Sequence, residues 1–205
     1  MKAWATFYDL TNPHLPGAST QSVDIALRNA AREFCRRAKV WRETHAAIPT
    51  VANTAVYGLT VTTEKVAAGI EYATCDLSPL RILTDSEAVP FNVLGPGTPG
   101  GILLVDASDV QLFPAPSTAG LSIIPYLVMM PGSTADGVTD QIFENYCEAI
   151  AAGAKSELML SPKKPYSDAA TGAAQRVIFE MAVARAALAR TGRGRSRARS
   201  ANRFI

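Results

Sequence analysis

The first long amphipathic pattern of the chain is QSVDIALRNAAREFCRRAKVWR, residues 21–42. Its apolar residues recur every three or four positions, which is the spacing of one face of an α-helix. They are Val23, Leu27, Ala30, Ala31, Phe34, Ala38 and Trp41. The hydroxyl of Ser19 or Thr20 can cap the N-terminus of this helix. The stretch therefore predicts an amphipathic helix, with Phe34 and Trp41 in a core.

Helical spacing returns twice in the C-terminal part of the chain. Residues 139–160 and residues 167–190 each predict a further helix. The apolar stripe of the last helix consists of Ala170, Ala173, Val177, Met181, Ala184 and Leu188. None of the three helices can bury its stripe alone, so we expect them to pack together as a bundle. The alanines of the last helix allow a close approach of another helix, from the same chain or from a neighbouring subunit.

The region between the helices has the period of two that is typical of β-strands. Short alternating segments are separated by Gly, Pro, Asp and Ser, as in an antiparallel sandwich or barrel. They are residues 54–61, 69–77, 80–84, 89–94, 101–106, 110–116 and 121–131. We therefore predict an α+β fold: a helical bundle with an inserted antiparallel β-sandwich or barrel-like domain and an extended C-terminal tail. The expected boundaries are 1–47 and 138–190 for the bundle, 48–137 for the β-domain and 191–205 for the tail.

The charge of the chain is distributed unevenly. Residues 1–180 contain 13 Lys and Arg against all 18 acidic residues, whereas residues 181–205 contain 7 Arg and no acid. A basic end on a mildly acidic body is typical of an interaction tail.

The sequence offers little support for catalysis, a metal or a membrane. His14 and His45 have no partners at catalytic or ligand spacing, and the three cysteines are far apart. No apolar run reaches the roughly 20 residues of a membrane span. We expect a protein that is not an enzyme, has no cofactor and does not contact a membrane.

Two segments resemble a known family when they are taken together. Residues 23–43, VDIALRNAAREFCRRAKVWRE, follow a short PG turn, and residues 144–168, ENYCEAIAAGAKSELMLSPKKPYSD, precede the last helix. Both are similar to segments of the head-to-tail adaptor proteins of short-tailed bacteriophages, of the tail tubular protein A type. Ala38 stands where that family commonly has threonine, and Tyr166 stands where it has tryptophan. The β-region matches no motif of the family.

The resemblance implies a structural role in the virion. Members of the family form a homo-oligomeric ring, generally a dodecamer, between the portal protein and the tail nozzle or tube. Genomic DNA passes through the channel of the ring without sequence-specific binding. We expect a protein of the virion neck or tail that is assembled in the host cytoplasm and takes part in DNA ejection.

The basic tail can be interpreted in three ways: a peptide that docks on another protein, an arm that binds DNA phosphates, or a disordered solubilising end. The resemblance implies that the C-terminal segment grips the portal, and a DNA arm has no need of a terminal Phe-Ile pair. We therefore favour portal docking, with a nucleic-acid-binding protein as the alternative function. The expected docking residues are Arg193, Arg195, Arg197, Arg199, Arg203, Phe204 and Ile205.

A second basic group lies on the first predicted helix. It consists of Arg28, Arg32, Arg36 and Arg37. These residues either face DNA in a channel, contact an adjacent subunit, or pair locally with Asp24 and Glu33. We favour contact with a subunit or local pairing, because a channel that held DNA tightly would impede its passage.

Overall fold

The computed structural model describes residues 1–88 and 95–195, with side chains as far as Arg190. The chain forms two compact units. One contains residues 1–40 together with the C-terminal part of the chain from Pro131, and the other contains Trp41–Met130. Each unit is described below by itself.

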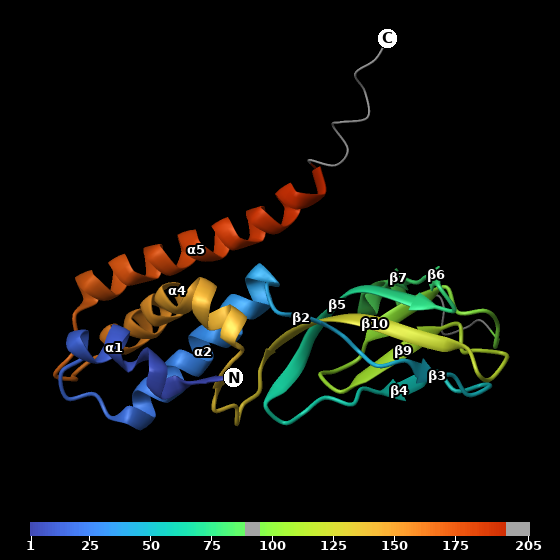
Figure 1. Cartoon of the computed structure of the whole chain (residues 1–205), viewed down its shortest axis with the longest axis horizontal. Coiled ribbons are helices and arrows are strands. Elements are labelled where there is room, and N and C mark those ends of the chain that lie inside the picture. The colour runs from blue at the N-terminus through green and yellow to red at the C-terminus, as the bar shows by residue number, and fades with distance from the viewer. Residues whose placement is uncertain (89–94, 196–205) are drawn as a thin grey trace, which may run out of the picture. The chain divides into compact units, whose positions relative to one another are not determined.

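The helical unit is built around α2 (Thr20–Ala38), α4 (Asp140–Met159) and α5 (Ala169–Arg195). α4 packs against both α2 and α5, and α2 also contacts α5 (Figure 1). A short N-terminal segment completes the unit. It consists of β1 (Lys2–Ala3), the 3-10 helix η1 (Trp4–Phe7), α1 (Tyr8–Thr11) and the 3-10 helix η2 (Asn12–His14). β1 pairs in antiparallel fashion with β11 (Gly137–Val138), directly before α4.

Polar side chains fix the starts of the three long helices. The Ser19 hydroxyl accepts a hydrogen bond from the backbone N–H of Ser22, which confirms the predicted cap of α2. Thr139 caps α4 in the same way, and the Asp168 carboxylate accepts from two backbone N–H groups at the start of α5. α2 ends at Ala38, four residues before the predicted end, because Lys39 adopts a left-handed conformation with φ of 52°.

The core of the helical unit is aromatic where the helices meet. The Phe34 ring of α2 lies 4.9 Å from the Tyr146 ring of α4 and 6.0 Å from the Phe179 ring of α5, measured between centroids. Phe34 and Phe179 are fully buried. All the apolar residues predicted for the face of α2 are buried, so that prediction is confirmed.

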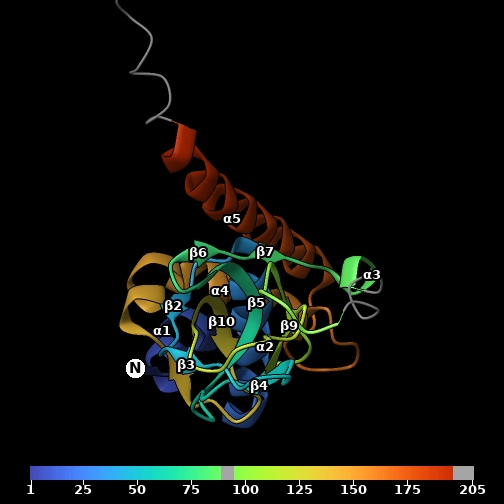
Figure 2. The same ribbon diagram turned by 90° about the vertical axis from the view of Figure 1, so that its right-hand side faces the viewer.

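α5 differs from its prediction in two respects. It continues to Arg195 rather than ending near residue 190. It also packs on α2 and α4 through other residues than expected, namely Gly172, Phe179, Val183 and Ala186, which are all buried. The predicted stripe from Ala170 to Leu188 is exposed along its whole length, so its expected packing inside the chain is wrong. Figures 1 and 2 show α5 as one unbroken helix whose C-terminal end projects past α4.

The β-unit contains two sheets. The first has the order β2 (Arg42–Thr44), β10 (Ser122–Pro131), β5 (Lys65–Cys75) and β6 (Ser78–Pro79), with β3 (Ile48–Pro49) also paired to β10. The second has the order β4 (Val56–Gly58), β9 (Asp109–Phe113), β8 (Gly101–Leu104) and β7 (Arg81–Ile82). The short helix α3 (Asp85–Ala88) follows β7.

The two sheets meet where β5 contacts β7 and β8. The described strands form no closed barrel, so the barrel-like alternative is not supported. The expectation of purely antiparallel pairing is wrong, because β7 and β8 run parallel and the isolated bridge between Gly97 and Pro116 is parallel too. Six of the predicted strand segments contain a described strand, and the remaining one, residues 89–94, lies outside the described residues.

Candidate functional site

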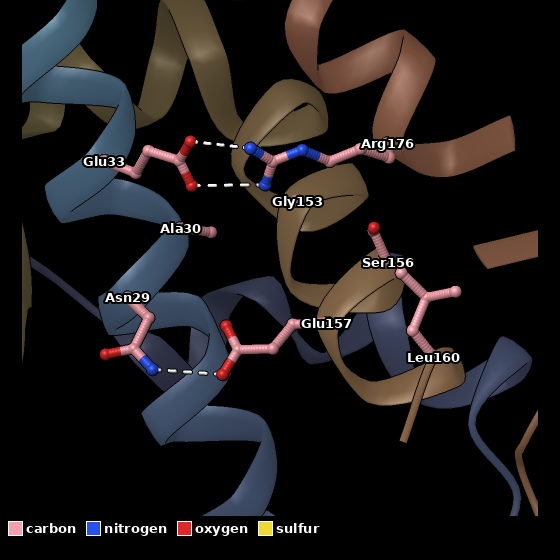
Figure 3. Close-up of a pocket in the computed structure, with 8 residues that line it drawn as sticks. All are labelled: Asn29, Ala30, Glu33, Gly153, Ser156, Glu157, Leu160 and Arg176. Carbon is pink, nitrogen blue, oxygen red and sulfur yellow. Dashed lines mark hydrogen bonds and ion pairs between the residues drawn. The ribbon is translucent and has the colours of Figure 1, made fainter. Parts of the chain in front are cut away.

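Four charged side chains link α2 to α5. Arg176 of α5 donates two hydrogen bonds to the Glu33 carboxylate of α2, at 2.7 and 3.2 Å. Arg37 of α2 donates to the same carboxylate at 2.7 Å and also to Glu180 of α5. Figure 3 shows the bonds between Glu33 and Arg176. We call Glu33, Arg37, Arg176 and Glu180 the interhelix charge cluster.

The charges of this cluster satisfy one another. Burial raises the pKa of Glu33, but hydrogen bonds from Arg176 and Arg37 outweigh that effect and hold the pKa below the ordinary glutamate value. Hydrogen bonding from Arg37 likewise lowers the pKa of Glu180. Both carboxylates are therefore ionised at neutral pH. The cluster joins α2 to α5 and leaves these groups engaged within the unit.

A cavity of about 310 Å³ lies beside the charge cluster, between α2, α4 and α5. Its wall includes Asn29, whose amide donates to the Glu157 carboxylate at 3.0 Å, as well as Glu33 bonded to Arg176 (Figure 3). These polar groups are bonded across the helices to one another. The cavity is accordingly a gap at a helix junction in which Asn29, Glu33, Glu157 and Arg176 are already paired with one another.

The four arginines predicted as one basic group have separate environments. Arg37 belongs to the interhelix charge cluster, and the Arg28 guanidinium donates through Nε to the backbone oxygen of Ala135 at 3.1 Å. Arg32 and Arg36 form no ion pair with any residue that the structure describes. Local pairing therefore occurs for Arg37 with Glu33, whereas Asp24 accepts from the Tyr8 hydroxyl instead.

The predicted docking residues lie at or beyond the end of the described chain. Arg193 and Arg195 fall in the last turns of α5. Arg197, Arg199, Arg203, Phe204 and Ile205 lie outside the described residues. Their role stays a prediction.

An extended apolar surface of the helical unit lies on the side of α5 that faces away from α2 and α4. We call it the outer face of α5, and it consists of Ala170, Ala173, Val177, Met181, Ala184 and Leu188. Val177 and Met181 are each 58% exposed and Leu188 is 69% exposed. At 1.5 Å per residue, the face is about 27 Å long. A continuous exposed apolar surface of this kind marks a site of protein–protein contact.

A groove between α4 and α5 lies beside this face and has a volume of about 660 Å³. Ile178, Met181 and Arg185 line its α5 side. Glu144 and Glu148 line its α4 side, one helical turn apart. We call this surface the α4–α5 groove. Its α4 side is acidic and its α5 side is apolar except for Arg185, so the groove offers both carboxylates and apolar contact to a basic amphipathic partner.

The groove was not predicted from the sequence. The apolar stripe of α5 was recognised, but the sequence could not show that Phe179 and Val183, rather than Val177 and Met181, face the core. The acidic wall was detectable in principle, because Glu144 and Glu148 are spaced four residues apart and therefore share one helix face.

The β-unit also carries exposed apolar groups. Leu77 is 89% exposed at the tip of the turn between β5 and β6. The rings of Tyr72 and Tyr126 are partly exposed and lie 5.5 Å apart on adjacent strands. His45 is held in place by the backbone, since its Nε2 accepts from the N–H of Thr60 and its Nδ1 lies 2.7 Å from the oxygen of Ala46.

No three His, Cys, Asp or Glu side chains in residues 1–88 and 95–195 come together in a way that could hold a metal ion. Within those same ranges, no helix combines the length and the apolar character that crossing a membrane requires.

Comparison with known proteins gives one clear result. The model of the SU10 adaptor protein family matches residues 5–203, which is nearly the whole chain. No curated protein matches the chain. The match includes both segments whose motifs indicated a phage adaptor, and it also includes the β-unit, where no motif was recognised. The family suggests a structural, non-enzymatic protein of the phage neck that interacts with other head and tail proteins. The chain belongs to the SU10 adaptor protein family.

Proposed function

We propose that the chain is a subunit of a head-to-tail adaptor ring in a phage virion, related to adaptors of the tail tubular protein A type. The ring is a dodecamer between the portal protein and the tail nozzle or tube. DNA passes through its channel during ejection without sequence-specific binding. Subunits are made in the host cytoplasm and act in the neck of the virion.

The observation that carries this proposal is the family match across residues 5–203. It agrees with the motifs in residues 23–43 and 144–168, which lie on α2 and α4 with its following turn. The exposed outer face of α5 supports an assembly role, because a soluble monomer rarely presents so long an apolar surface without a partner.

The C-terminal segment supplies the contact with the portal in this proposal. Its arginines pair with carboxylates of the portal through two hydrogen bonds each, and Phe204 with Ile205 fills an apolar pocket. The direct connection of this segment to α5 supports the proposal, since a helix anchored in the core gives the segment a fixed starting point.

The proposal is tested by deleting residues 196–205, which leaves the whole of α5 in place. The shortened chain should keep its helical circular dichroism spectrum but fail to co-sediment with purified portal rings. Unchanged co-sedimentation would refute portal docking by this segment.

Two matched variants separate the contributions of charge and apolar contact. One replaces Phe204 and Ile205 by serine and keeps every arginine, and the other replaces Arg197, Arg199 and Arg203 by glutamine and keeps the apolar pair. Portal docking predicts that both weaken co-sedimentation. If the arginine variant instead loses only salt-sensitive DNA binding and both variants still bind portals, the segment is a DNA arm.

A further inference from the structure

The helical unit carries two surfaces of opposite character that cannot meet within one chain. One is the α4–α5 groove, with its acidic wall and the adjoining outer face of α5. The other is the exposed side of α2, which we call the outer face of α2. It consists of Ile25 and Arg36, which are exposed, and the half-buried Arg32.

Helix geometry shows why the outer face of α2 does not reach the groove of its own chain. Phe34 points towards α4 and α5, because its ring contacts Tyr146 and Phe179. At about 100° per residue, Arg32 and Arg36 each lie about 160° around α2 from Phe34. Their side chains therefore point away from α4 and α5, and they form no ion pair within the described residues.

The acidic wall of the groove is similarly open to a partner. Glu144 is exposed and forms no ion pair with a described residue, and Glu148 is exposed beside Lys155. Burial lowers the pKa of Lys155, an effect that Glu148 opposes. On the α4 side one half-buried lysine accompanies two exposed carboxylates, so that wall keeps a negative charge, while Arg185 adds a positive charge on the α5 side of the same groove.

The spacing of the charges is the same on the two surfaces. Arg32 and Arg36 are four residues apart, and so are Glu144 and Glu148, which corresponds to a rise of about 6 Å in both helices. Ile25, 45% exposed on α2, supplies an apolar group for the apolar side of the groove. The methylene stems of the arginines cover further apolar surface while their guanidinium groups reach the carboxylates.

We infer that the α4–α5 groove of one copy binds the outer face of α2 of a second copy. This inference rests on the proposed ring and identifies the contact between its subunits. The contact joins two different surfaces, so each copy retains a free groove on one side and a free α2 face on the other. Such a head-to-tail contact propagates from subunit to subunit and closes into a ring when the rotation per subunit allows.

Pairing of α5 with α5 of a second copy fits the observations less well. It would cover the apolar residues, but it would bring acidic walls of both copies together and leave Arg32 and Arg36 unpaired. A two-fold contact of that kind also stops at a dimer.

The test is a pair of charge reversals in the full-length chain. The α2 variant carries Arg32→Glu and Arg36→Glu, and the groove variant carries Glu144→Arg and Glu148→Arg. Sedimentation velocity over a concentration series measures self-association. Wild type should associate, and each variant alone should associate at least about 100-fold more weakly, because like charges then face each other.

An equimolar mixture of the two variants should associate again. The unchanged α2 of the groove variant fits the unchanged groove of the α2 variant, and the two reversed surfaces fit each other. A third variant, Lys163→Glu with Lys164→Glu, has the same change in net charge as the α2 variant but lies in the exposed turn after α4. It should associate like wild type. Circular dichroism checks that every variant is folded.

Three results would overturn the inference: a wild type that stays monomeric at its highest soluble concentration, variants that associate like wild type, or a mixture that does not recover. Association that appears only after residues 196–205 are removed would overturn the inference too, because the C-terminal segment would then be what fills the groove in the full-length chain. Portal co-sedimentation of wild type is measured in parallel. If portal binding persists while the mixture fails to recover, this contact is wrong and the proposed function stands.

Discussion

Gly153 of α4 should not accept a larger residue without loss of stability, and Gly153→Ala tests this directly. A Cβ atom at this position would lie 2.7 Å from Cδ2 of Phe179 and 2.9 Å from Cβ of Ala30. Both neighbours are buried in other helices, so neither can swing into solvent. Overpacking of this kind costs about 2 kcal/mol. The better helix propensity of alanine returns about 1 kcal/mol, which leaves a net loss of about 1 kcal/mol.

A loss of that size should lower the melting temperature by about 3 °C for a chain of this length. Far-ultraviolet circular dichroism during heating measures it. The control is Gly69→Ala in β5, where a Cβ meets no atom within 4 Å. The control should show no such decrease. A melting temperature of Gly153→Ala equal to or above that of wild type would show that the helix junction accepts the added methyl group without strain.

The obstacle can be identified by adding Phe179→Leu. If the Phe179 ring is what the new methyl group meets, Gly153→Ala should cost about 1 kcal/mol less in the leucine background than in wild type. Strictly additive losses would show that the ring is not the obstacle and that the contact with Ala30 is responsible.

Three further predictions concern other parts of the chain. In the folded protein the pKa values of Glu33 and Glu180 are lowered, so the stability that these carboxylates add is complete above about pH 4.3, the pKa of an unfolded glutamate, and is lost as the pH falls through the folded pKa values. Urea titrations should therefore show the free energies of unfolding of wild type and Glu33→Gln converging at acid pH, and a difference in free energy that stays constant with pH would contradict the cluster. Leu77 has a left-handed φ of 68° in a two-residue turn, which glycine adopts without strain. Leu77→Gly should therefore stabilise the β-unit by about 1 kcal/mol and raise its melting temperature, and a lower melting temperature would show that the leucine side chain stabilises the turn. Cys35 is fully buried, and burial raises the pKa of its thiol to about 12. Mass spectrometry after brief maleimide treatment of the native protein should therefore find label on the partly exposed Cys147 and not on Cys35, and early labelling of Cys35 would place that thiol outside the core.

Much of the helical unit was predictable because its local signals agree. In α2 the capping residue Ser19 precedes apolar residues that recur at helical spacing, and the helix starts at the residue that this pattern predicts. α5 shows where such reasoning fails. Alanines occur on every side of it, so periodicity alone cannot distinguish the stripe containing Val177 from the one containing Phe179. The choice is made by the fit of the Phe179 ring against Phe34 and Gly153, which no local pattern contains.

The candidate site depended even more on tertiary structure. Arg37 bonds to Glu180, a residue 143 positions later, and this pairing separates Arg37 from Arg32 and Arg36 although all three looked equivalent in the sequence. The parallel pairing of β7 with β8 was also hidden, because strand direction depends on how the intervening chain is routed rather than on the strand residues.

The helical unit is built from two separate segments of the chain, and this determines the order in which its parts are made on the ribosome. All of the β-unit, Trp41–Met130, is translated before α4 and α5, so it can fold while α2 still waits for its partners. The helix α5 emerges after α2, the β-unit and α4. If subunits join through the α4–α5 groove as proposed, a nascent chain without α5 has no groove to offer, and the order of translation delays association of unfinished subunits on one messenger RNA.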